Sequence, residues 1–359
     1  MVFTVLTIAV VLLAILTSQN KKAKKIYCYI IGASFIFFAG FRSLLVGTDS
    51  LTYAKVFQNT MPITKESFFA AFEKKEFFYK ILTGVLRRIT DNYTILFFIV
   101  ALFFISVVCF LVRKYSTSPM LSFILFMSMG YFSFSMAGIR QTIAMGFLFL
   151  ALDRMLKKKY VAAVILVLIA SGFHITSLIY FLAILIYFIP FNIFSILVAS
   201  ALSIFIYVSG NSLTTRIVDV VWGDSRGYGK FEYGGISTLI LLVVVFVAAC
   251  IFYPGLIKYS KTRKQEKDQS MEIDSYFIKL LMFSIPFQIM TTYQANAFRI
   301  AMLFHFPMIL LLPNVISKQQ NRVVRIVAKV VVIGCLMYQL FAITYGSADI
   351  NPFTFFWQV

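Results

Sequence analysis

Three arginines interrupt otherwise apolar sequence, and their side chains could bind a phosphate group. Arg42 lies in FRSLLVGTDSLTY, Arg140 in IRQTIAMGFLFLA and Arg299 in FRIAMLFHF. The planar guanidinium group can bind a phosphate through two parallel hydrogen bonds. A charge in apolar membrane sequence costs at least a few kcal/mol, so it is usually paired, cavity-lining or functional. An arginine near a helix end can instead extend to the lipid headgroups, but three together favour one anionic ligand.

A histidine and two carboxylates could supply acid–base chemistry beside these arginines. His174 occurs in FHITSLIY and is a candidate general base, because imidazole titrates near neutral pH. Asp49 directly follows Gly47 and Thr48, and Glu76 lies in EFFYKIL. Either carboxylate could act as a base or hold a hydroxyl group of a substrate. The alternative roles are a packing histidine and solvated loop charges, and the sequence does not choose between His174 and Asp49 as the base.

The composition indicates that these side chains are positioned by membrane helices. Of the 359 residues, 60% are hydrophobic and 13% are charged, whereas a soluble protein has about 25% charged residues. The net charge of +19 would suit a nucleic-acid partner, but the basic residues form short clusters between apolar runs, which is typical of topology signals. The four cysteines lie far apart in apolar sequence and indicate neither disulfides nor a zinc site.

The chain is expected to be a single all-α integral membrane domain over residues 1–359. A spanning helix needs about 20 mostly apolar residues. The segment 68–89 is apolar but too charged to span freely, and an interfacial or re-entrant helix is expected there. About twelve transmembrane helices are predicted, approximately at 2–19, 26–46, 93–112, 119–136, 139–155, 160–172, 174–189, 192–210, 236–257, 276–294, 297–315 and 323–344.

The distribution of basic residues predicts which ends of these helices face outward. If the N-terminus is outside, nearly every loop on the inner side is basic, as the positive-inside rule requires. Two long outer loops then remain, at 47–92 and 211–235, and the second is rich in glycine. Arg42, Arg140, His174 and Arg299 all fall at outer ends of predicted helices. Arg140 and Arg299 lie at predicted helix N-termini, where the helix dipole also favours an anion.

Several motifs of other enzyme classes are missing from the sequence. It contains no P-loop, no dinucleotide-binding glycine pattern, no HExxH and no GxSxG. No pair of acidic residues with DxD-like spacing occurs in the predicted outer loops, so a metal-bound nucleotide-sugar donor is not supported. We therefore expect a metal-independent site without a cofactor, in which arginines neutralise a diphosphate leaving group.

The same segments resemble the EpsG-like branch of the Wzy-type bacterial polysaccharide polymerases. They occur in the family's order over most of the chain. One departure is Leu303-Phe304, where the family leads us to expect a tyrosine-containing pair. The matching segments are FRSLLVGTDSLTY with Arg42, Gly47, Asp49 and Tyr53, EFFYKIL with Glu76 and Tyr79, IRQTIAMGFLFLA with Arg140, Gln141 and Ala144, FHITSLIY with His174, and FRIAMLFHFPMILLLP with Arg299.

The resemblance implies a membrane glycosyltransferase of GT-C-type architecture. Such an enzyme would join oligosaccharide repeat units carried on undecaprenyl diphosphate into an exopolysaccharide, capsule or O-antigen. It would work on the outer face of the bacterial cytoplasmic membrane, after a flippase has delivered the units, with a chain-length regulator as a further expected partner.

The resemblance also suggests a role for each candidate residue. Arg140 and Arg299, assisted by Arg42, would bind the donor diphosphate, and His174 or Asp49 would activate the acceptor hydroxyl. The residues expected to contact the rest of the substrate are Tyr53, Glu76 and Gln141.

Three other functions remain open at this stage. A transporter or lipid flippase would place coupling charges near the bilayer midplane and often has related halves, neither of which the sequence indicates. A membrane O-acyltransferase would use the histidine but would leave the three arginines without a role. A non-catalytic scaffold of an export complex would tolerate replacement of all these charges.

Overall fold

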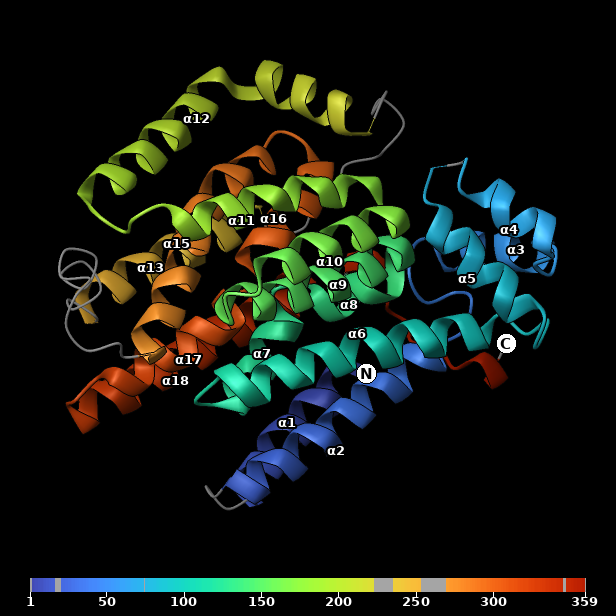
Figure 1. The fold of residues 1–359 in the computed structure, drawn as a ribbon. Coiled ribbons are helices and arrows are strands. Elements are labelled where there is room, and N and C mark those ends of the chain that lie inside the picture. The colour runs from blue at the N-terminus through green and yellow to red at the C-terminus, as the bar shows by residue number, and fades with distance from the viewer. Residues whose placement is uncertain are drawn as a thin grey trace. The chain divides into compact units, whose positions relative to one another are not determined.

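The computed structural model describes residues 2–16, 21–73, 75–222, 235–252, 269–344 and 347–358. Within these ranges every named element is a helix, and a single isolated bridge pairs Arg42 with Phe355 in an antiparallel manner (Figure 1). The all-α prediction therefore agrees with the part of the chain that the structure describes.

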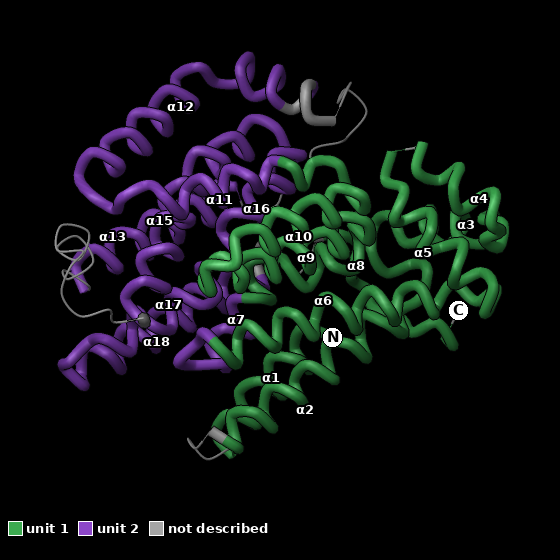
Figure 2. The backbone as a smooth tube through the Cα atoms, in the orientation of Figure 1, with its two compact units in different colours: residues 1–114, 126–178, 344–359 green, residues 115–125, 179–343 purple. Residues whose placement is uncertain are grey.

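The chain divides into two compact units (Figure 2). Unit 1 comprises residues 1–114, 126–178 and 344–359 and contains all the candidate residues but Arg299. Its α-helices are α1 (Val2–Leu16), α2 (Lys21–Gly40), α3 (Ser50–Asn59), α4 (Lys65–Ala71), α5 (Phe77–Arg87), α6 (Thr94–Tyr115), α8 (Tyr131–Ala137), α9 (Ile139–Leu156) and α10 (Tyr160–Phe173).

Unit 2 comprises residues 115–125 and 179–343. Helix α7 (Pro119–Ser128) and the 3-10 helix η1 (Ile175–Tyr180) have residues in both units, as do α6 through Tyr115 and the π-helix η3 (Gln339–Thr344) through Thr344. The other helices of unit 2 are α11 (Phe181–Phe188), α12 (Ile193–Trp222), α13 (Gly235–Phe252), α15 (Gln269–Met290), η2 (Ala295–Ala297), α16 (Phe298–His305), α17 (Met308–Lys318) and α18 (Arg322–Tyr338).

The number of helices that can span a membrane is smaller than predicted. Among the described residues, six helices are long and apolar enough, or up to eight if each of two bent pairs is one span. The bent pairs are α7 with α8, at 51°, and η2–α16 with α17, at 50°. The twelve predicted segments do coincide with helices or helix pairs. However, three of them are too short, and α9 carries Arg140, Asp153 and Arg154, so twelve spans are not shown.

The predicted outer segment 47–92 contains three short helices, α3, α4 and α5. Instead of one helix over residues 68–89, the chain breaks between α4 and α5 at Glu76, whose backbone is left-handed. Thr64 and Ser67 form a capping box that begins α4. The break matters for function because it places the Glu76 side chain at the start of a helix.

The second predicted loop, 211–235, begins as a helix in the structure. Helix α12 continues to Trp222 after an irregular residue, Gly210, with φ 59° and ψ −140°. Only glycine adopts such a backbone conformation readily. Gly235, at the end of this predicted loop, begins α13, whereas Gly223, Gly227, Gly229 and Gly234 lie outside the described residues.

Candidate active site

The candidate site of unit 1 is centred on Glu76, which precedes α5. Its backbone has φ 58° and ψ 40°, in the left-handed region. For a residue with a side chain this conformation costs about 1–2 kcal/mol, and such strain is concentrated at functional sites. Glu76 thus occupies a strained backbone conformation that asparagine or glycine would adopt more easily.

The Glu76 carboxylate joins Arg140 and His174. One oxygen, Oε2, forms an ion pair with Arg140 Nη1, and the other, Oε1, lies 2.8 Å from His174 Nδ1. The side chains of Glu76 and His174 are 14% and 10% exposed, whereas that of Arg140 is 42% exposed. The carboxylate and the imidazole are therefore largely enclosed, while the guanidinium group keeps an accessible part.

Helix α10 ends at Phe173, and His174 follows directly as its C-cap residue. The His174 backbone is extended, its N–H donates to Ala170 O at 2.9 Å, and its carbonyl accepts from Ser177 N at 3.0 Å in the first turn of η1. Helix α10 packs against both α9 and α5. A Cβ atom on Gly172 would lie 2.1 Å from the ring of Phe78, so glycine is needed for α5 to approach this closely.

Arg140 is the second residue of α9 and lies close to two tyrosine rings. Its guanidinium carbon is 5.8 Å from the centre of the Tyr53 ring and 6.0 Å from that of Tyr79. These are cation–π distances, and the two rings themselves meet edge to face at 6.1 Å. The arginine is thus positioned by a carboxylate and by aromatic faces from α3 and α5.

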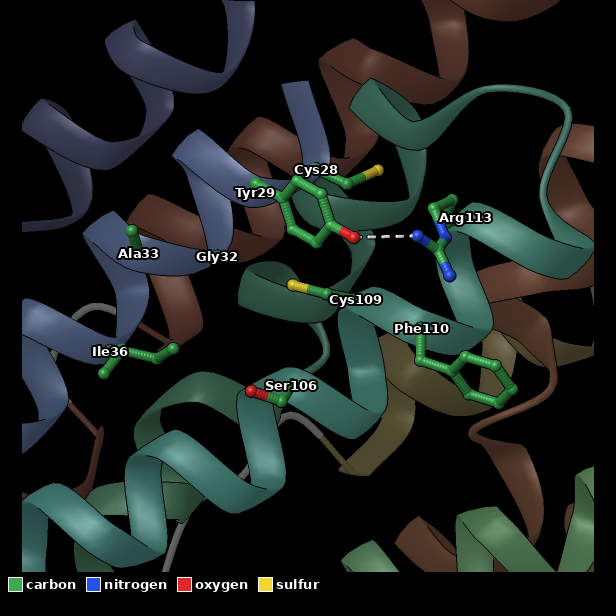
Figure 3. A pocket seen from close by; sticks show the side chains of 9 residues that line it. All are labelled: Cys28, Tyr29, Gly32, Ala33, Ile36, Ser106, Cys109, Phe110 and Arg113. Atoms are coloured by element: carbon green, nitrogen blue, oxygen red, sulfur yellow. Dashed lines mark hydrogen bonds between the residues drawn. The ribbon is translucent and has the colours of Figure 1, made fainter. Parts of the chain in front are cut away.

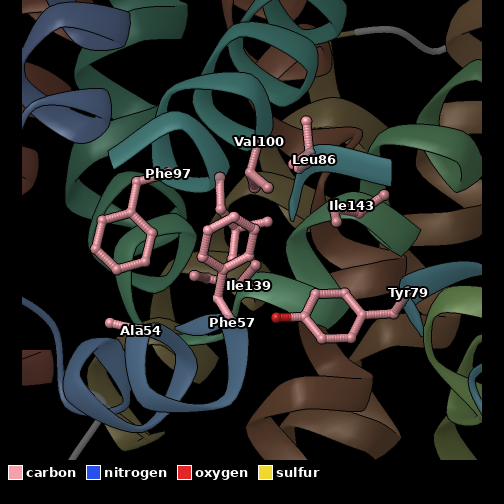
Figure 4. Close-up of a cluster of buried hydrophobic side chains, with 9 residues drawn as sticks. Ala54, Phe57, Tyr79, Leu86, Phe97, Val100, Ile139 and Ile143 are labelled. Atoms are coloured by element: carbon pink, nitrogen blue, oxygen red, sulfur yellow. The ribbon is translucent and has the colours of Figure 1, made fainter. Parts of the chain in front are cut away.

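A buried apolar cluster supports this arrangement (Figure 4). It unites side chains from α3, α5, α6 and α9, so the helices that carry Tyr53, Tyr79 and Arg140 share one core. Its members are Ala54, Phe57, Tyr79, Leu86, Leu96, Phe97, Val100, Ile139 and Ile143.

The electrostatic environment keeps Glu76 ionised. Burial by itself would raise the pKa of the Glu76 carboxyl, but the hydrogen bond with His174 and the charge of Arg140 outweigh it and lower this pKa below its ordinary value. A carboxylate can only accept hydrogen bonds. His174 Nδ1 must therefore carry the proton of the shared hydrogen bond, and Nε2 is the acceptor nitrogen when the ring is neutral.

Arg42 has a different environment from Arg140. It is 1% exposed, its Nη2 donates to Met136 O at 2.9 Å, its Nη1 donates to Ala39 O, and its Nε donates to Ser50 Oγ at 3.3 Å. Its guanidinium carbon also lies 4.0 Å from the centre of the Phe97 ring. These contacts join the end of α2 to α3, α6 and α8, which favours a structural role over the predicted contact with a diphosphate.

Asp49 lies at the start of α3, and Gln141 lies at the start of α9. Asp49 is half-buried at the N-cap of α3, where its carbonyl accepts from Tyr53 N at 3.0 Å. Among the residues that the structure describes, the Asp49 carboxylate forms no hydrogen bond or ion pair with Arg140 or His174. Gln141 is buried in the first turn of α9, next to Arg140. Arg299 belongs to unit 2, as the half-buried second residue of α16.

The sequence model of the EpsG family matches residues 25–356. The chain belongs to the EpsG family. It is therefore a multi-pass membrane protein of exopolysaccharide biosynthesis. No curated protein and no solved structure matches the chain, so the GT-C-type architecture stays a prediction.

Two further features of this EpsG-family site follow from the structure. Tyr79 was not among the predicted site residues, although it lies in the first turn of α5, where its backbone N–H donates to Glu76 O at 3.1 Å. Its buried hydroxyl has no hydrogen-bond partner among the described residues. Among the residues that the structure describes, no group of three or more His, Cys, Asp or Glu side chains could hold a metal ion.

Proposed function

We propose that this EpsG-family protein is a polymerase that joins oligosaccharide repeat units linked to undecaprenyl diphosphate. The observation that carries the proposal is the ionised Glu76, which holds an imidazole on one oxygen and a partly exposed arginine on the other. This transfer requires an oriented general base next to a group that binds the leaving diphosphate.

The proposed reaction forms one glycosidic bond and breaks one bond to phosphate. His174 Nε2 accepts the proton of a sugar hydroxyl on the acceptor unit, while Nδ1–H donates to Glu76 and stabilises the imidazolium ion that forms. The hydroxyl oxygen bonds to the anomeric carbon of the donor chain. The bond from that carbon to the diphosphate oxygen breaks, and undecaprenyl diphosphate leaves with the electron pair.

Arg140 is proposed to bind the leaving diphosphate. Its guanidinium group has five N–H donors, of which the ion pair with Glu76 uses only part, and it is 42% exposed. Charge stabilisation by positioned donors is commonly the largest contribution to catalysis. Arg299 is proposed as the second diphosphate ligand, Tyr53 and Gln141 as contacts to the substrate, and Arg42 as the residue that holds the surrounding helices together.

His174 is proposed as the base in preference to Asp49. The imidazole has a partner that fixes its orientation, whereas Asp49 marks the start of α3. We further propose that the site faces the outer side of the bacterial cytoplasmic membrane. A flippase would supply its substrate, and a chain-length regulator would act on its product.

Single substitutions in the native host test the proposal. His174→Ala, Arg140→Ala and Arg299→Ala are each compared with Lys80→Ala, which removes an exposed charge from α5. Membrane insertion is verified first, and polymer length and lipid-linked units are then measured. We expect single units to accumulate on the outer side in the three variants and normal polymer in Lys80→Ala. Retention of units inside would indicate a flippase, and normal polymer in all variants would contradict the proposal.

A further inference from the structure

A cavity between α2 and α6 in unit 1 lies outside the candidate active site (Figure 3). Its volume is about 320 Å³, within the range of about 300–1,000 Å³ that is typical of small-ligand pockets. Its walls are mainly apolar. The residues that line it are Cys28, Tyr29, Gly32, Ala33, Ile36, Ser106, Cys109, Phe110 and Arg113.

The cavity follows the axes of both helices. Tyr29, Gly32, Ala33 and Ile36 share one face of α2, because residues three, four and seven apart are neighbours on a helix. Ser106, Cys109, Phe110 and Arg113 repeat this spacing on α6. Seven residues of helix measure about 10 Å, so the cavity is an elongated groove that would hold part of an extended hydrocarbon chain.

Two cations meet at one end of this groove. Arg113 Nη1 donates to the Tyr29 hydroxyl at 3.0 Å, a contact that Figure 3 shows as a dashed line. The Arg113 guanidinium carbon lies 5.8 Å and Lys25 Nζ 5.7 Å from the centre of the same Tyr29 ring. Two like charges at one ring repel each other, so a bound anion would stabilise this arrangement.

The two helices provide no anion of their own. Neither α2 nor α6 contains an aspartate or a glutamate, whereas α2 begins with four lysines in its first five residues. Asp153, the carboxylate that pairs with the neighbouring Lys114 at 2.5 Å, is also bound by Lys157 at 3.0 Å. Among the residues that the structure describes, neither Lys25 nor Arg113 forms an ion pair with a carboxylate, so an anion from outside the chain is expected here.

We infer that this groove binds an anionic phospholipid. Its phosphate lies between Arg113 and Lys25, and one acyl chain lies along Gly32, Ala33 and Ile36. Both α2 and α6 are candidate membrane spans, so the groove between them is expected to face the lipid bilayer. An acyl chain alone would fill it without preference, and the two cations select the headgroup. None of these residues belongs to the proposed catalytic cluster, so the inference is independent of the proposed function.

Native mass spectrometry of the full purified chain tests this inference. The protein in detergent is incubated with equal amounts of palmitoyl-oleoyl-phosphatidylglycerol and palmitoyl-oleoyl-phosphatidylcholine. We expect one retained phosphatidylglycerol molecule per chain and little phosphatidylcholine. Arg113→Ala should lower this retention on the order of tenfold, because the phosphate loses a charged hydrogen-bond donor. Ala33→Phe, which fills the exposed groove, should lower the retention of both lipids.

Arg88→Ala is the matched control, because it removes an exposed arginine near the opposite end of α6. Its retention should equal that of the unmodified chain. Equal retention of the two lipids, or equal loss in Arg88→Ala and Arg113→Ala, would overturn the inference. Displacement of the lipid by inorganic phosphate alone would also overturn it, because the site would then bind a free anion. If Ala33→Phe does not fold, the comparison of Arg113→Ala with Arg88→Ala decides the result.

Discussion

At the scale of single residues, Glu76 determines what its two partners can do. Its ionised carboxylate fixes the proton on His174 Nδ1 and holds the guanidinium group of Arg140. The sequence drew attention to all three residues through their apolar surroundings and through the family resemblance. It offered Glu76 as a possible base or as a contact to the substrate. It did not predict the pairing with Arg140 and His174, because the sequence could not place residues 76, 140 and 174 next to one another.

Glu76→Gln should reduce polymer formation on the order of 10²-fold while leaving the size of the side chain unchanged. The amide no longer stabilises an imidazolium ion at His174, and general base catalysis contributes about 10²–10⁴-fold. Rates measured on purified protein against pH provide the test, with Lys80→Ala as the control. A rate within about twofold of the unmodified protein would exclude Glu76 from the mechanism.

Acid should remove a stabilisation that Glu76 provides. The pKa of Glu76 is lower in the folded protein than in the unfolded chain, where glutamate titrates near about 4.3. The stabilisation is therefore complete above that pH and is lost as the pH falls through the lower folded value. Thermal unfolding in detergent from pH 7 downward should show a smaller acid-induced decrease in Glu76→Gln. Parallel curves for the two proteins would contradict this.

Glu76→Gly separates backbone strain from the function of the side chain. Glycine adopts the left-handed conformation at little cost, which would recover about 1 kcal/mol of the strain at φ 58°. Glu76→Gly should therefore unfold at a higher temperature than Glu76→Gln, although polymer formation should fall on the order of 10²-fold or more in both. A lower unfolding temperature for the glycine variant would show that the strain argument is wrong.

Arg42 should behave as a structural residue. Its guanidinium group donates to three acceptors of the chain and is enclosed, so Arg42→Ala leaves a cavity and unpaired carbonyl groups. We expect the free energy of unfolding to fall by at least about 2 kcal/mol. Thermal unfolding of purified protein measures this. Unchanged stability with a weaker apparent affinity for the donor would instead support the sequence-based prediction of a diphosphate ligand.

At the scale of secondary-structure elements, the site depends on how closely α5 approaches α10. Gly172 allows this contact, and the ring of Phe78 stacks on Phe173, with centres 5.6 Å apart. The short α5 was not predicted as a separate helix, because the apolar segment 68–89 gave no signal for a break at Glu76. The sequence around Glu76 is nevertheless rich in aromatic residues, which is typical of a segment that packs against other helices.

Gly172→Ala should separate these two helices and move Glu76 away from His174. The added Cβ atom would lie 2.1 Å from the Phe78 ring, and overpacking typically costs about 1–3 kcal/mol. Both the unfolding temperature and the polymerisation rate should fall. Ser171→Ala on the same helix is the control, because it adds no atoms. Equal behaviour of the two variants would show that this close contact has no influence on the site.

At the scale of the whole molecule, the sequence predicted the class of protein better than its topology. Long apolar runs identify membrane helices whatever their partners, so the predicted segments coincide with the helices. Twelve spans are not shown among the described residues, because hydropathy cannot distinguish a spanning helix from a short or bent one inside a helical protein, such as α8 or α16. Arg299 belongs to unit 2, so its predicted partnership with Arg140 rests on the sequence.

The central claim is that the chain itself forms glycosidic bonds through the cluster of Glu76, Arg140 and His174. The most direct test is reconstitution of the purified protein in liposomes that contain one undecaprenyl-diphosphate-linked repeat unit and no other protein. We expect a ladder of longer lipid-linked chains, with one free undecaprenyl diphosphate for each unit added, and no ladder with His174→Ala. A ladder of equal length and rate with His174→Ala, or movement of intact units across the bilayer without elongation, would contradict the claim.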